Sequence, residues 1–128
     1  MESDLKLLIK EFYEYFKQKF NLQPGIKIAI RYDEENAKDP LGLTAYYDPQ
    51  ENKIVLFCYG RHPKDITRSL AHELVHALQR QNGRFEGENL GDSTQDNPDM
   101  LEIEGECYRD SNLIFRDWTE KKKLNGSN

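Results

Sequence analysis

The feature that most constrains this fold is the stretch from His72 to His76, which reads HELVH and has the pattern HExxH. No proline or glycine lies between Pro63 and Gly83, so one helix can contain the whole stretch. On that helix the two histidines are one turn apart on the same face, and both imidazoles can reach one metal ion. Glu73 stands beside them and is free to act as a base.

The other side of this helix is apolar. We expect it to pack into the core while the histidine face lines a cleft. The alternative is that HExxH is a coincidence on an ordinary amphipathic helix. The chain has only three histidines, so chance formation of the pattern is rare, and the pattern favours a metal site. The apolar positions are Ile66, Leu70, Leu74, Ala77 and Leu78.

The length and charge of the chain limit the classes of protein to which it can belong. With 128 residues the chain is expected to form a single domain, residues 1–128, with one modest core. Charged residues make up 32% of the chain and the net charge is -5, which argues for a soluble protein without nucleic-acid or membrane partners. The run Lys121-Lys122-Lys123 is too short to outweigh this acidic body. We take a monomer as the default.

The expected location is the cytoplasm. No segment resembles a signal peptide, and the apolar stretches are too short to span a bilayer. Cys58 and Cys107 do not make a disulfide framework, which fits a reducing compartment. Neither cysteine belongs to a CxxC or CxxH pair, so a buried apolar role is favoured over metal ligation.

Periodicity predicts the other elements. Apolar residues at helical spacing indicate a core-covering helix over residues 3–19, and alternation indicates a strand over residues 26–32. Residues 33–40 form a polar connector. Two more strands, over residues 43–47 and 53–59, are separated by a turn-rich loop typical of an antiparallel hairpin. The predicted fold class is therefore α+β, with a small three-stranded, mostly antiparallel sheet.

Beyond the HExxH helix, a long acidic loop over about residues 83–98 is expected to be flexible, and long loops of this kind tend to be functional lids or mobile segments. A final helix is predicted over residues 98–122, followed by a basic tail that frays over about 122–128. Gly105 lies inside this helix at a cost of about 1 kcal/mol, which suggests close approach of another helix. The candidates for burial on this helix are Leu101, Tyr108, Leu113, Phe115 and Trp118.

A catalytic zinc usually has three protein ligands, so two histidines are not enough. The remaining histidine, His62, lies beside Pro63, where a loop or capping role is favoured. The acids Glu102, Glu104 and Glu106 on the final helix are better placed. Glu102 and Glu104 are about 200° apart around a helix, so they cannot both face the metal.

The order of strand, hairpin, HExxH helix, loop and Glu-bearing helix resembles the minimal single-domain forms of the thermolysin-like, or gluzincin, metallopeptidases. The resemblance implies a zincin-like fold. In these families the ligand Glu has a small residue three positions later and a polar residue four positions later. Glu102 matches with Gly105 and Glu106, and Glu106 would then hydrogen-bond the outer nitrogen of a zinc histidine. Glu106 is the competing ligand, although Arg109 occupies its small-residue position.

The resemblance implies a zinc-dependent metallopeptidase with one Zn2+ per chain, bound by His72, His76 and Glu102. A metal-activated water would hydrolyse the peptide bond with Glu73 as general base. A peptide or protein substrate would pair with an exposed edge strand. The residues expected on that edge are Leu43, Thr44 and Ala45, and the candidates for stabilising the oxyanion are Tyr46, Tyr47, Tyr108 and Arg109.

Two other classes of function remain open. In the first, the site is catalytically inactive and the domain is a zinc-binding or peptide-binding interaction module. In the second, HExxH is accidental and the chain is a small interaction domain of helices and sheet.

Overall fold

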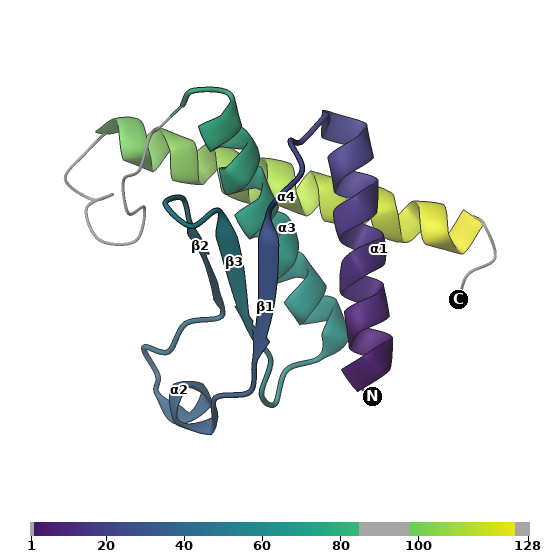
Figure 1. Ribbon diagram of the computed structural model, residues 1–128, viewed down its shortest axis with the longest axis vertical. Coiled ribbons are helices and arrows are strands. Elements are labelled where there is room, and N and C mark those ends of the chain that lie inside the picture. The colour runs from purple at the N-terminus through teal and green to yellow at the C-terminus, as the bar shows by residue number, and fades with distance from the viewer. Residues whose placement is uncertain (1, 85–97, 125–128) are drawn as a thin grey trace.

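The computed structural model describes residues 2–84 and 98–124, which form an α+β fold of helices around a small sheet. The helices α3 and α4 lie behind the sheet, α1 runs beside its edge, and the short helix α2 lies at one end (Figure 1). Within these ranges no helix has the length and apolar character needed to cross a membrane. The elements are α1 (Glu2–Phe20), β1 (Lys27–Arg31), α2 (Glu34–Lys38), β2 (Ala45–Asp48), β3 (Lys53–Phe57), α3 (Pro63–Gln81) and α4 (Pro98–Leu124).

The sheet is mixed, so the prediction of a mostly antiparallel sheet is wrong. Its order is β1-β3-β2, in which β1 pairs in parallel with the central β3 and β2 pairs with β3 antiparallel. The reason is the connector, residues 32–44, which crosses the end of β3 before β2 begins. The sequence predicted no helix in this connector, but Asp33 caps α2 by accepting the N–H of Asn36 at 3.0 Å.

The core lies between the helices and one face of the sheet. Phe12 and Phe16 of α1 are fully buried, and the ring of Phe12 meets that of Trp118 edge-on at 5.1 Å. This confirms the prediction that the first helix covers the core. The predicted apolar face of α3 is also confirmed: Ile66, Leu70, Leu74 and Ala77 are buried, and Leu78 packs partly buried against them.

The buried face of α4 differs in part from the predicted one. Phe115 and Trp118 are buried as predicted, whereas Leu101, Tyr108 and Leu113 are about half exposed or more. Relative to the prediction, α4 is rotated about its axis, so that a stripe containing small and polar side chains is buried. The buried residues of this stripe are Ile103, Cys107, Ser111, Ile114, Phe115 and Trp118.

Two further predictions for α4 are corrected. Gly105 is exposed, and a Cβ placed there would meet no atom within 4 Å, so close helix approach does not explain this glycine. The helix also continues to Leu124, so residues 122–124 are helical rather than frayed. The acidic loop predicted over residues 83–98 and the end of the tail lie mostly outside the described residues.

Candidate metal centre

The HExxH stretch occupies the middle of α3, whose ends are fixed by local features. His62 is the N-cap and accepts the N–H of Lys64 on its Nδ1 at 3.0 Å, and Pro63 follows in the first turn. This confirms the capping role predicted for His62. Within the helix, the rings of His72 and His76 lie 4.8 Å apart. The two imidazoles are therefore neighbours on one face, as their spacing predicted.

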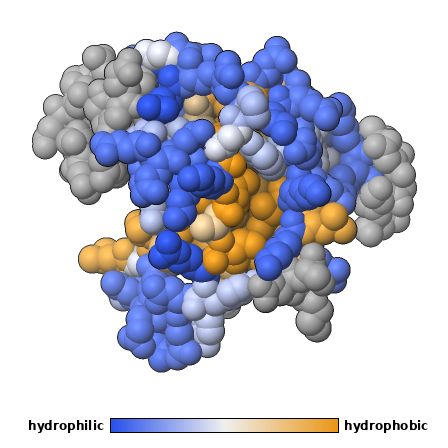
Figure 2. All heavy atoms as spheres, viewed as in Figure 1, coloured by the Kyte–Doolittle hydropathy of each residue, from blue (hydrophilic) through white to orange (hydrophobic). Residues whose placement is uncertain are grey.

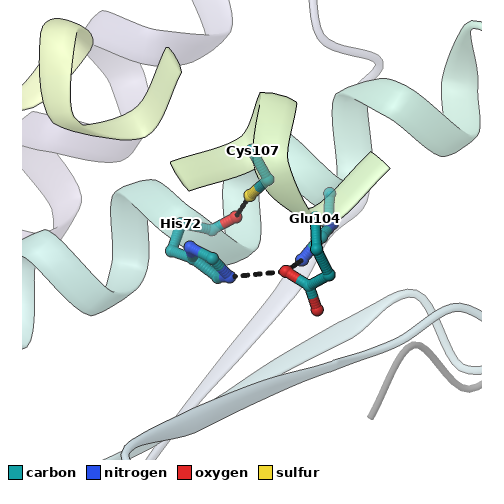
Figure 3. Close-up of side chains that lie close together, drawn as sticks. His72, Glu104 and Cys107 are labelled. Carbon is teal, nitrogen blue, oxygen red and sulfur yellow. Dashed lines mark hydrogen bonds and ion pairs between the residues drawn. The ribbon is translucent and has the colours of Figure 1, made fainter. Parts of the chain in front are cut away.

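A carboxylate from α4 meets both histidines. Oε1 of Glu104 lies 3.1 Å from Nε2 of His76 and 3.4 Å from Nε2 of His72. The side chains of His72 and Glu104 point toward one another across the space between the helices (Figure 3). The side chain of His76 is 4% exposed, whereas those of His72 and Glu104 are 19% and 25% exposed. The cluster is thus closed on the His76 side and reachable on the other.

The charges in this cluster support one another. Burial alone would raise the pKa of Glu104, but hydrogen bonds from His72 and His76 outweigh it and lower the pKa to about 2. For His76, burial favours the neutral ring, yet the hydrogen bond to Glu104 and the charge of Glu73 raise the pKa. In the metal-free protein Glu104 therefore favours positive charge on His76, in the place that a cation would take.

The structure brings Glu104, and not Glu102, to the histidines. Glu102 is exposed and is not part of the cluster of potential metal ligands. The sequence correctly indicated that only one of the two acids can face a metal, but it chose the wrong one. The reason is the rotation of α4 described above, which puts Ile103 and Cys107 in the core and Glu104 at the border of the buried face.

Cys107 is a fourth potential donor that the sequence did not predict as a ligand. Its Sγ and the ligand atoms of His72, His76 and Glu104 all lie within 4.8 Å of one another. The thiol points at the main chain of α3 and donates to the carbonyl oxygen of His72 at 3.0 Å (Figure 3). Burial raises its pKa, which keeps the thiol protonated. The spacing of Glu104 and Cys107, three apart on one helix, is the signal that could have found both.

Gln79 orients His76 from behind. Its Oε1 lies 2.9 Å from Nδ1 of His76, and its Nε2 donates to the carbonyl of Ile103 at 3.0 Å and to Glu106 at 3.2 Å. Because the amide nitrogen faces these acceptors, the amide oxygen must accept the Nδ1 proton, which leaves Nε2 of His76 available as a metal ligand. Glu106, predicted to bond a histidine directly, instead acts through Gln79.

Glu106 also ties the end of α3 to α4. Arg84 donates to both oxygens of its carboxylate, at 2.8 Å and 2.7 Å. The hydrogen bond from Arg84 lowers the pKa of Glu106. This bidentate pair keeps Glu106 ionised as an acceptor for Gln79.

Glu73 is a buried acid next to the histidines, with 9% of its surface exposed. Burial raises its pKa, although the nearby charges of His76 and His72 oppose the shift. A carboxyl group in such a position can take up and release a proton closer to neutral pH than an exposed glutamate does.

Among the four oxyanion candidates, Tyr108 is the one whose ring contacts a histidine of the cluster. Its ring lies 4.6 Å from that of His72, and its side chain is exposed. The hydroxyl of Tyr47 donates to Asn52 at 3.0 Å. Arg109 is exposed and contacts its neighbour Asp110. Tyr46 packs against Phe57 in the sheet.

β2 is an edge strand, as predicted for the substrate-binding segment, and it packs against α3. The prediction for Leu43 and Thr44 is not supported. Both main-chain groups of Leu43 are bonded to the side chain of Asn36, and the carbonyl of Thr44 accepts the N–H of Phe57. Along an antiparallel strand, the main-chain N–H and C=O groups of successive residues point alternately toward the partner strand and away from it. Since Thr44 faces β3, the main-chain groups of Ala45 and Tyr47 point away from the sheet and form its open edge.

Two imidazoles, a carboxylate and a thiol that converge between two helices can hold a metal ion. Comparison of the chain with protein-family models, with curated proteins and with solved structures finds no match.

Proposed function

We propose that this protein is a zinc-dependent peptidase of the zincin type. The observation that carries the proposal is the position of Oε1 of Glu104, 3.1 Å and 3.4 Å from the Nε2 atoms of the two HExxH histidines. Glu73 lies buried beside them. Two imidazole nitrogens and one carboxylate oxygen are a donor set that suits catalytic zinc.

We assign His72, His76 and Glu104 as the ligands. Cys107 stays outside this set because its thiol proton is engaged by the carbonyl of His72. Three protein ligands leave one coordination position open, which catalysis requires. When bound there, zinc would polarise a scissile carbonyl and make a water molecule more acidic.

The residues around the ligands have separate tasks. Glu73 accepts a proton from the attacking water and passes it to the leaving amine. Gln79 holds the ring of His76 in one tautomer. The hydroxyl of Tyr108, on a ring that contacts His72, is the proposed donor to the developing oxyanion. An extended peptide substrate pairs with the main chain of Ala45 and Tyr47 on the edge of β2.

We place this reaction in the cytoplasm, where Cys58 and Cys107 would stay reduced. Both are buried and neither takes part in a disulfide.

Metal content tests the ligand assignment. Untagged protein purified without chelator should contain about one zinc per chain, and His76→Ala and Glu104→Gln should contain almost none. Glu102→Gln is the matched control, because it makes the same chemical change two positions away at an exposed site. Zinc lost from Glu102→Gln and kept by Glu104→Gln would overturn the assignment.

Catalysis is tested with Glu73→Gln on a library of quenched fluorescent peptides. The variant should bind zinc like the parent and lose activity by about 10²- to 10⁴-fold, the usual contribution of a general base. Full activity in a zinc-loaded variant would remove Glu73 from its role.

The second candidate function is a zinc-binding interaction module with a closed four-ligand site. The position of Cys107 within 4.8 Å of the other donors favours it. Cys107→Ser distinguishes the two, because a serine can still donate to the carbonyl of His72. Unchanged zinc content and activity support the peptidase. The interaction module is supported if the cobalt-substituted parent shows a thiolate-to-metal charge-transfer band that Cys107→Ser lacks, and if the parent hydrolyses no peptide.

A further inference from the structure

An open apolar groove lies between α1 and β1, on the opposite edge of the sheet from β2. Ile28 and Ile30 of β1 line one side, and Ile9 and Tyr13 of α1 line the other. Its volume is about 460 Å³. Figure 2 shows this groove as a hydrophobic hollow in the middle of the face that carries β1.

The edge of β1 in this groove carries unused hydrogen-bonding groups. The N–H of Lys27 bonds to Asn52 and the carbonyl of Arg31 accepts from Cys58, so both residues direct their main chain toward β3. Alternation along the strand then directs the N–H and C=O groups of Ile28 and Ile30 away from the sheet. In the part of the chain that the structure describes, β1 pairs with β3 alone. The groove therefore combines an apolar lining with a main-chain edge that an extended chain can pair with.

The charged residues at the groove are basic. Lys6 and Lys10 of α1 line it, and no described acidic side chain does. Lys27 and Arg31, at the two ends of β1, are exposed. The chain as a whole has a net charge of -5, so this basic surface is a local departure from its acidic character.

We propose that this groove binds an extended segment of another protein in which apolar side chains alternate with aspartate or glutamate. The segment adds a strand to the edge of β1 and places its apolar side chains against Ile28 and Ile30. Because side chains alternate between the two faces of a sheet, its carboxylates then point to the opposite face, toward the exposed Lys27 and Arg31. A second copy of this chain is a poor occupant. Antiparallel pairing of two β1 strands about Ala29 would set Lys27 opposite Arg31, and like charges repel there.

The site is distinct from the metal centre and does not depend on it. The test uses the zinc-loaded full chain with Glu73→Gln, which prevents cleavage, and a short blocked peptide of alternating valine and glutamate. Bound peptide should slow hydrogen exchange at the amides of Ile28 and Ile30 by tenfold or more. Protection at Ala45 and Tyr47 instead would mean that the peptide binds at the edge of β2, and would overturn the proposal.

Charge reversal tests the basic rim. Lys27→Glu, at an exposed position of β1, should weaken binding of the peptide by about fivefold or more, and a peptide with lysine in place of glutamate should recover affinity for this variant. Lys19→Glu makes the same change on α1 outside the groove and should alter the Kd less than about twofold. Equal Kd values for the two variants, or no binding to the parent, would overturn the proposal.

Discussion

Gln79→Leu is the substitution that most directly tests how the metal centre is built. The amide of Gln79 is 3% exposed and joins His76 of α3 to Ile103 and Glu106 of α4. Leucine has a similar size but no hydrogen-bonding groups, so the change removes these bonds without opening a large cavity.

The expected cost follows from the partners that lose their bonds. Nδ1 of His76 loses its hydrogen bond to Gln79 in buried surroundings, whereas the carbonyl of Ile103 keeps its helical bond within α4 and Glu106 keeps Arg84. The loss of a hydrogen bond at one buried group costs about 1–3 kcal/mol, which is the loss of stability expected in the metal-free protein. Zinc affinity should fall by about 10- to 100-fold, because the ring of His76 is no longer fixed.

Urea denaturation in chelator measures the first effect, and zinc competition with a chromophoric chelator measures the second. Gln81→Leu is the matched control, since Gln81 also bonds main-chain groups, of Asn21 and Gln23, but at an exposed position where water can replace it. It should cost less than about 1 kcal/mol and leave zinc affinity unchanged. Equal zinc affinity in Gln79→Leu and the parent would refute the orienting role.

The remaining predictions concern single sites. Gly105→Ala should stabilise the protein to urea by about 1 kcal/mol, because the position is helical and a Cβ meets nothing; a loss of stability would contradict this. Cys58 and Cys107, whose pKa values burial raises, should resist alkylation in native protein and react fully in urea. In chelator, the raised pKa of His76 contributes stability that is complete below about pH 6.5 and is lost as pH rises through the folded-state pKa. The melting temperature should therefore fall as the pH rises above about 6.5, and His76→Gln should flatten this dependence.

Local patterns were sufficient to predict the three long helices and the centre of the site. The span of α3 follows from Pro63 and from the break at Gly83, whose φ is +79. His72 and His76 follow from spacing on that helix alone. Such features depend on residues that are close in sequence, and tertiary packing adds little to them.

The order of the strands was not predictable in the same way. The hairpin of β2 and β3 is local, and it was predicted correctly as antiparallel. The place of β1 depends on whether residues 32–44 cross the end of β3, and neither alternation nor turn residues encode that choice. The helix α2, whose residues are not buried, adds no apolar signal that could have indicated it.

The sequence analysis named Glu102 as the acid beside the histidines, whereas the structure has Glu104 there. The cause is the orientation of α4, which is rotated about its axis relative to the prediction. Leu101 and Tyr108 lie fourteen and seven residues before the buried Phe115 and so suggest burial of the same face, but both are exposed, whereas Ile103, Cys107 and Ser111 are buried. The buried stripe includes a cysteine and a serine, so its apolar character is weak in the sequence. A ligand contributed by a second helix is therefore identified only once the packing of the two helices fixes that rotation.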